Sequence, residues 1–136
     1  MIYVAGALFT PGERRTLEEI VLLCEQTGWK TYLPHRDGGI LQPDRSNSAE
    51  VFKADLDALD RCSAVVAVLE AEVDSGTAWE MGYAFRSGKK VFVLCEDFRV
   101  QSGATKLNPM LTESSQLFGN RASLRNALIS LKESSR

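Results

Sequence analysis

Residues 64–69 (AVVAVL) constrain the fold more than any other segment, because six consecutive apolar residues leave no polar face for solvent. A strand of this kind is typical of a parallel sheet that is covered by helices on both faces. Shorter apolar runs at residues 2–5 and 91–94 have the same character. The sequence therefore predicts a sheet that is buried on both sides.

Segments with helical spacing separate these strands. Residues 10–13 form a helix start, with a capping threonine, a proline at the first helical position and a glutamate that closes a capping box. Further helices are predicted over about 48–59, 77–86 and 120–131, and further strands at 29–33 and 116–118. Strands and helices alternate in this way in a three-layer α/β fold, flavodoxin-like or Rossmann-like, with a five-stranded parallel sheet.

Length and composition limit the classes of function. A chain of 136 residues is expected to form one domain, residues 1–136. Its net charge of −2 argues against a partner that is a nucleic acid polymer, and no apolar run is long enough to cross a membrane. The three separated cysteines, Cys24, Cys62 and Cys95, are typical of a reduced protein in the cytoplasm.

Motifs for metals and organic cofactors are missing. The chain has one histidine and no CxxC or HExxH motif, so we predict no metal site. It has no GxGxxG after the first strand, no phosphate-binding Walker loop and no GxSxG motif. We therefore expect no bound cofactor.

The segment from Asp74 to Ala84 has the pattern most indicative of chemistry. It follows a buried strand and opens a helix, at the strand ends where ligands bind in such sheets. We expect Glu80 in the first turn of that helix, where the helix dipole favours an ionised carboxylate suited to act as a nucleophile. The alternative is that Thr77 and Glu80 form a capping box, and that Asp74 is a loop or cap residue.

Other candidates have plain structural alternatives. Asp55 is one of three aspartates on a predicted helix, and most of such a face is solvated; one aspartate turned inward would supply the second carboxylate of glycosyl chemistry. Tyr3 lies in the first strand, where the ordinary expectation is a core aromatic residue with its hydroxyl satisfied. His35, Arg36 and Asp37 begin a long loop, and long loops are often functional.

Several segments together resemble the nucleoside 2-deoxyribosyltransferase family. They are IYVAGxLF at residues 2–9, LPHRDG at 33–38, DLxxL at 55–59 and VDSGTAWEMGYA at 73–84. Their order and spacing agree from residue 2 to about 110, and the last block is the most specific.

The resemblance implies a mechanism. Glu80 would attack the anomeric carbon of a 2′-deoxynucleoside to form a covalent deoxyribosyl-enzyme, and a second base or water would then take the sugar with retained configuration. Asp55 would handle the proton of the base, and Tyr3 would orient Glu80. Asn108 resembles an asparagine that reaches the sugar in a neighbouring subunit's site. The remaining substrate contacts are expected from Gly6, Phe9, His35, Arg36, Asp37, Asp74, Ser75 and Met110.

The same superfamily contains nucleoside 5′-monophosphate N-glycosidases, which hold the phosphate with serines. One of those serines stands at the position of Asp74, where a carboxylate would accept a hydrogen bond from a free 5′-hydroxyl but repel a phosphate. A nucleoside is therefore the favoured substrate, although the neighbouring Ser75 could offer a hydroxyl.

Three other hypotheses remain at this stage. The chain could be an N-glycosidase that acts on nucleosides or on 5′-monophosphates, a non-catalytic nucleotide-sensing module with a GTxxE helix start, or a plain α/β scaffold. The resemblance further implies small-molecule partners, a nucleoside or nucleotide and a free nucleobase, and a homo-oligomer.

Overall fold

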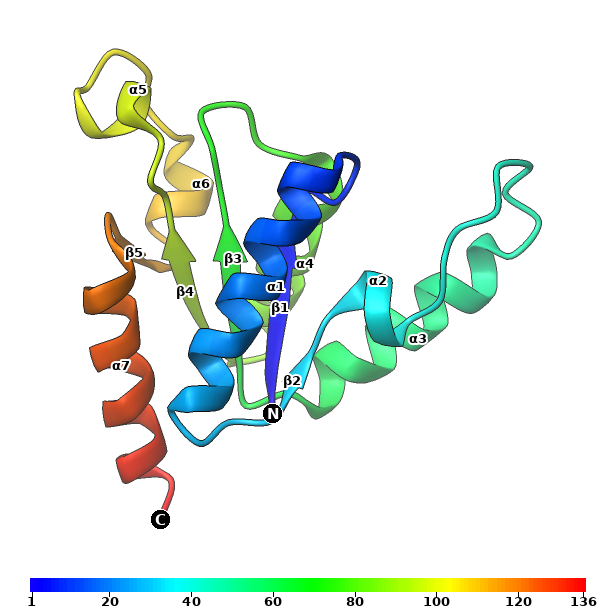
Figure 1. Cartoon of the computed structure of the whole chain (residues 1–136), viewed down its shortest axis with the longest axis horizontal. Helices are drawn as coiled ribbons and strands as arrows, with labels where there is room; N and C mark the ends of the chain where they lie inside the picture. The colour runs from blue at the N-terminus through cyan, green and yellow to red at the C-terminus, as the bar shows by residue number, and fades with distance from the viewer.

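The computed structural model describes residues 1–136 as one five-stranded sheet and seven helices (Figure 1). The elements in chain order are β1 (Ile2–Gly6), α1 (Pro11–Gln26), β2 (Thr31–Tyr32), α2 (Pro34–Asp37), α3 (Ser48–Arg61), β3 (Ala64–Val68), α4 (Ser75–Arg86), β4 (Lys90–Leu94), α5 (Phe98–Gln101), α6 (Pro109–Thr112), β5 (Gln116–Phe118) and α7 (Arg121–Ser134).

All strand pairs are parallel, and the strand order is β2-β1-β3-β4-β5. This confirms the predicted three-layer α/β fold. The order reverses between β1 and β3, because the chain moves outward to β2 and then returns across β1.

The alternating side chains of the central strands form two separate cores. Even-numbered residues of β1, Ile2 and Val4, pack with α1 and α7, and odd-numbered ones, Tyr3 and Ala5, pack with α3 and α4. This is the consequence of the two-residue period of a strand. The capping box predicted at Thr10 and Glu13 is present at the start of α1.

The structure differs from the prediction in the loops. Three short helices, α2, α5 and α6, lie where irregular chain was expected, and α2 and α6 each begin with a proline at a position that favours helix entry. Strand β2 is only two residues long. Helix α4 begins at Ser75, two residues before the predicted start.

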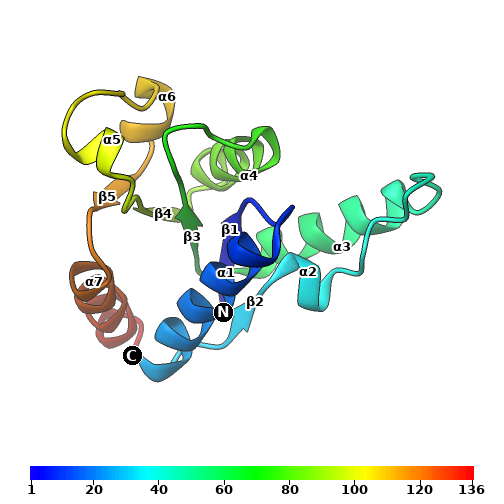
Figure 2. The ribbon, with the colours of Figure 1, turned by 45° about the horizontal axis from the view of Figure 1, so that its top comes forward.

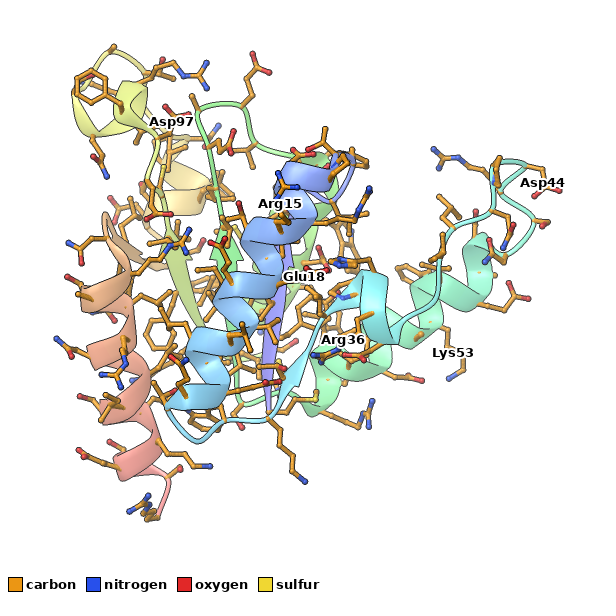
Figure 3. All side chains as sticks on the ribbon, viewed as in Figure 1. Arg15, Glu18, Arg36, Asp44, Lys53 and Asp97 are labelled. Carbon is orange, nitrogen blue, oxygen red and sulfur yellow. The ribbon has the colours of Figure 1, made fainter.

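The segment between α2 and α3 projects away from the sheet together with the first turns of α3 (Figure 2). Asp44 lies near the outer end of this projection (Figure 3). The later turns of α3 return to the sheet, where Ala58 and Leu59 are buried. No helix of the chain is both long enough and apolar enough to span a membrane.

Candidate active site

Two tyrosines on adjacent strands form the base of the candidate site. Tyr3 on β1 and Tyr32 on β2 are paired in register, so their side chains leave the sheet on the same face. Their rings are stacked, with centroids 5.3 Å apart and planes at 20°. Both residues are buried, Tyr3 completely.

Each tyrosine donates a hydrogen bond to a different carboxylate. The Tyr3 hydroxyl donates to Oε2 of Glu80 on α4, and the Tyr32 hydroxyl donates to Oδ1 of Asp55 on α3, at 2.9 Å. We call these four residues the two-carboxylate centre. It brings together three predicted residues, Tyr3, Asp55 and Glu80, from β1, α3 and α4, and adds Tyr32, which the sequence did not indicate.

The pKa of the Glu80 carboxyl is raised to about 7. Burial is the largest cause, and the negative charges of Asp55 and Asp74 act in the same direction, while the Tyr3 hydrogen bond opposes them. The hydroxyl therefore stabilises the ionised form of a carboxylate that burial would otherwise keep protonated.

Burial also raises the pKa of Asp55, and the hydrogen bond from Tyr32 opposes the rise. As whole residues, Asp55 and Glu80 are both partly exposed. Glu80 can therefore hold or release a proton near neutral pH, and Asp55 keeps its proton to higher pH than an ordinary aspartate, as nucleophilic and general acid–base chemistry requires.

Glu80 does not occupy the position predicted for it. It is the sixth residue of α4 and so lies in the second turn, not the first. The capping-box alternative is also wrong, because Asp74 caps the helix by accepting hydrogen bonds from the Thr77 backbone N–H at 3.0 Å and from its hydroxyl at 2.9 Å. The Glu80 carboxylate takes no part in the cap and instead accepts the hydrogen bond from Tyr3.

Asp74 also lines a small cavity of about 100 Å³ at the carboxyl ends of β1 and β3. Three further carboxylates, those of Glu13, Glu70 and Glu72, line the same cavity, and no arginine or lysine does. Gly6 ends β1 near this place, where an added Cβ would lie 2.6 Å from Leu17 Cδ2 on α1, so a larger residue would displace that side chain. Ser75, the first residue of α4, is exposed.

The predicted loop residues lie elsewhere. Arg36 and Asp37 pair with each other at 2.6 Å, and Arg36 also donates to the Thr31 carbonyl. The His35 ring faces α1, with Nε2 3.5 Å from the Glu18 carboxylate. Figure 3 labels Glu18 on α1 and Arg36 on α2. These partners are not members of the two-carboxylate centre, and a substrate role for the three residues stays a prediction.

The remaining candidates are on the surface. Phe9 is 70% exposed and Met110 is 79% exposed. Asn108 caps α6 through a hydrogen bond from the Met110 backbone N–H at 2.9 Å, and it is exposed. None of the three contacts the two-carboxylate centre through a hydrogen bond within this chain, and their roles stay predictions.

Gly38 was not singled out in the sequence as a site residue, yet it touches the centre. A Cβ added there would collide with Asp55 Oδ1 and lie 2.5 Å from the Tyr32 hydroxyl. The backbone thus passes directly against the Tyr32–Asp55 pair, and a side chain at this position would displace one of the two.

Comparisons with known proteins concern the family and the fold. The family model described as nucleoside 2-deoxyribosyltransferase matches residues 2–120. Among curated proteins, none matches the chain by sequence.

Solved structures share the fold. A 2-deoxyribosyltransferase from Bacillus psychrosaccharolyticus is 21% identical, with a TM-score of 0.80 over 92% of this chain and 90% of its own. A deoxyribosyltransferase from Leishmania mexicana is 21% identical, with a TM-score of 0.72 over 95% and 96%. A CMP N-glycosidase from Clostridium botulinum is 23% identical, with a TM-score of 0.58 over 93% and 96%.

Proposed function

Because the chain belongs to the nucleoside 2-deoxyribosyltransferase family, we propose that it transfers 2-deoxyribose between nucleobases at the two-carboxylate centre. The observation that carries the proposal is the pair of half-buried carboxylates, Glu80 and Asp55, each held by its own tyrosine. Two carboxylates with different partners can take the two different roles that retaining glycosyl transfer needs.

Glu80 acts as the nucleophile in the first half-reaction. Tyr3 holds Oε2, and no other protein group donates a hydrogen bond to this carboxylate, so Oε1 is available to attack C1′. The C1′–N bond breaks as the C1′–O bond forms, and the bonding electrons go to the base nitrogen. Asp55 gives that base a proton, and a deoxyribosyl ester of Glu80 remains.

The second half-reaction reverses these steps. A nitrogen of the acceptor base attacks C1′, Asp55 takes the proton of that base, and the Glu80 carboxylate leaves. Two displacements at the same carbon retain the configuration. If water replaces the base, the product is free sugar, and the reaction is that of an N-glycosidase. This is the alternative function, and the structural neighbour from Clostridium botulinum is a CMP N-glycosidase.

The acid-lined cavity supports a nucleoside rather than a 5′-monophosphate as substrate. Asp74 can accept a hydrogen bond from a free 5′-hydroxyl, whereas a phosphate there would meet the carboxylates of Asp74, Glu13, Glu70 and Glu72. Repulsion between like charges is strong in a partly desolvated cavity.

The chain is further proposed to act in the cytoplasm as a homo-oligomer. Its three cysteines are free and buried, which suits a reducing compartment. Phe52 and Trp79 are about half exposed and contact each other edge to face at 5.8 Å, and such exposed apolar residues suit a subunit contact. Light scattering during size-exclusion chromatography would measure the mass, and a monomer at all concentrations would contradict this part.

Product chromatography tests the proposed activity. The protein is incubated with 2′-deoxynucleosides, with and without a second free base, and separately with 2′-deoxynucleoside 5′-monophosphates. A new nucleoside that needs the acceptor base supports transfer. Free base and sugar phosphate from the monophosphates alone would instead assign an N-glycosidase. No turnover in any arm would favour a nucleotide-sensing module.

A further inference from the structure

Tyr32 mirrors Tyr3 at the two-carboxylate centre. The two residues are in register on neighbouring strands, and their rings stack at 5.3 Å. The Tyr3 hydroxyl donates a hydrogen bond to Glu80, and the Tyr32 hydroxyl donates one to Asp55 at 2.9 Å. The two carboxylates are thus held by one stacked pair of phenols.

The Tyr32 hydroxyl is the one protein donor to the Asp55 carboxylate. No backbone N–H or cationic side chain bonds to Asp55, whereas the other two aspartates of α3, Asp57 and Asp60, bond to Lys53 and Tyr83 at the protein surface. Tyr32 occupies Oδ1 only, so Oδ2 is left without a protein partner. Tyr32 is only 8% exposed, so packing fixes the position of its ring. Its hydroxyl is therefore a stationary donor for the Asp55 carboxylate.

The backbone of Gly38 lies beside this hydrogen bond. It approaches so closely that an added Cβ would collide with Asp55 Oδ1 and stand 2.5 Å from the Tyr32 hydroxyl. Oδ1 of Asp55 therefore has the phenol of Tyr32 and the backbone of Gly38 packed on one side of it.

We propose that Tyr32 is a positioning residue that holds Oδ1 of Asp55, so that Oδ2 exchanges the proton with the departing and arriving nucleobase. The inference rests on the proposed function and assigns to Tyr32 a part in the acid–base half of the reaction only. Tyr3, in contrast, acts on the nucleophile.

Because Tyr32 acts only on the acid–base group, a Tyr32→Phe variant should lose activity only on substrates whose leaving group needs a proton. A natural nucleobase needs a proton as it leaves, so kcat/KM should fall by about tenfold, a part of the 10²–10⁴-fold that general acid catalysis typically contributes. A 4-nitrophenyl 2-deoxy-β-ribofuranoside releases a stable phenolate without a proton. Its kcat/KM, which reports only the departure of the leaving group, should stay within about twofold of the wild-type value with Tyr32→Phe.

Two variants make the comparison specific. Tyr83→Phe is the matched control, because it removes a Tyr-to-Asp hydrogen bond of 2.6 Å to Asp60 on the same helix. It should leave both substrates unaffected. Tyr3→Phe should slow both substrates, because the nucleophile is needed for each. Equal loss on both substrates with Tyr32→Phe, or no loss on either, would overturn the assignment.

A carbon NMR titration of the Asp55 carboxyl gives a readout that needs no turnover. A donor on Oδ1 favours the carboxylate, so Tyr32→Phe should raise the measured pKa of Asp55, and Tyr83→Phe should not. An unchanged pKa overturns the role of Tyr32. If the wild-type protein cleaves no nucleoside, the proposed function fails, and the titration still decides whether Tyr32 controls Asp55.

Discussion

The phenol of Tyr3 on β1 donates a hydrogen bond to Oε2 of Glu80 on α4, which joins two residues that lie 77 positions apart. Tyr3 is completely buried beneath α3 and α4, so its position is fixed by the sheet. A carboxylate on a helix is thereby held in place by a strand. In the proposed reaction this arrangement would fix the orientation of the attacking carboxylate before substrate arrives, which is a major source of rate enhancement in enzymes.

Replacement of Tyr3 by phenylalanine should move the pH dependence of the reaction. The Tyr3 bond lowers the pKa of Glu80, which burial raises to about 7, so its loss raises that pKa further. Glu80 must be ionised to attack, and the acid limb of the kcat/KM profile should therefore move to higher pH. The expected loss is about tenfold at about pH 6 for each pKa unit, and smaller above about pH 8.

The profile of Tyr3→Phe is compared with that of Tyr83→Phe, whose hydroxyl bonds to Asp60 at the surface. A loss with Tyr3→Phe that is the same at every pH would mean that Tyr3 supports the fold and does not tune Glu80.

Glu80→Gln should make the protein more stable at neutral pH. The carboxyl has a pKa near 4.5 when unfolded and about 7 when folded, so the unfolded state releases its proton first as the pH rises. This costs stability between about pH 4.5 and pH 7, and the full cost, roughly 3 kcal/mol, is present above that window. Glutamine keeps the acceptor for Tyr3 and removes the cost.

Thermal melts at about pH 4 and pH 8 measure the effect. The gain in melting temperature with Glu80→Gln should be much larger at pH 8, and the exposed Glu133→Gln should change the melt little at either pH. A Glu80→Gln variant that is less stable than the wild type at pH 8 would contradict the raised pKa.

The sequence was sufficient to predict the sheet, because residues 64–69 and 91–94 are apolar without interruption and can only be buried. It also brought Tyr3, Asp55 and Glu80 together through the family resemblance. It misplaced the start of α4, since Asp74, Ser75 and Thr77 are all good capping residues and only the tertiary structure shows that Asp74 is the cap.

Tyr32 and Gly38 illustrate what sequence reasoning could not find. A tyrosine in a strand is typical of a core, and nothing in its spacing connects it to Asp55, 23 positions later. The glycine pair at 38–39 indicates a turn. The observation that a Cβ at Gly38 would collide with Asp55 depends on the path of the chain between α2 and α3, which local patterns do not determine.

Asp74→Ser should shift the substrate preference toward 5′-monophosphates. Serine also caps helices well, so α4 should keep its start while the cavity loses one negative charge. We expect KM for nucleosides to rise about tenfold, in proportion to a lost hydrogen bond to a charged group, and turnover of monophosphates to increase. Steady-state kinetics on matched nucleoside and monophosphate pairs measures both changes.

Asp74→Ala is the control for the Asp74→Ser variant, because it removes the charge without supplying a hydroxyl. A wild-type protein that already prefers monophosphates would contradict the assignment of Asp74 to the 5′-hydroxyl.

Gly38→Ala should displace residues of the two-carboxylate centre, although Gly38 is not itself one of its four residues. The new methyl group would stand 2.5 Å from the Tyr32 hydroxyl and 3.0 Å from the Pro34 carbonyl oxygen, so Tyr32, Asp55 or the backbone must move. Such overpacking costs about 1–3 kcal/mol. We expect lower stability in denaturant melts together with a fall in kcat on natural nucleosides.

Gly82→Ala on α4 is the matched control, because an added Cβ there meets no atom within 4 Å. It should keep full activity and gain up to about 1 kcal/mol from the higher helix propensity of alanine. Unchanged kcat in Gly38→Ala would show that the Tyr32–Asp55 pair tolerates displacement.

The most direct test of the account is an incubation of the wild type and Glu80→Gln with a 2′-deoxynucleoside and a second free base, followed by chromatography of the products and mass analysis of the protein. If Glu80 is the nucleophile, the wild type should form a new β-configured nucleoside and should carry one deoxyribosyl group on Glu80 when the acceptor is left out. The rate with Glu80→Gln should be at least about 10³-fold lower. A new nucleoside formed at an undiminished rate by Glu80→Gln would contradict it.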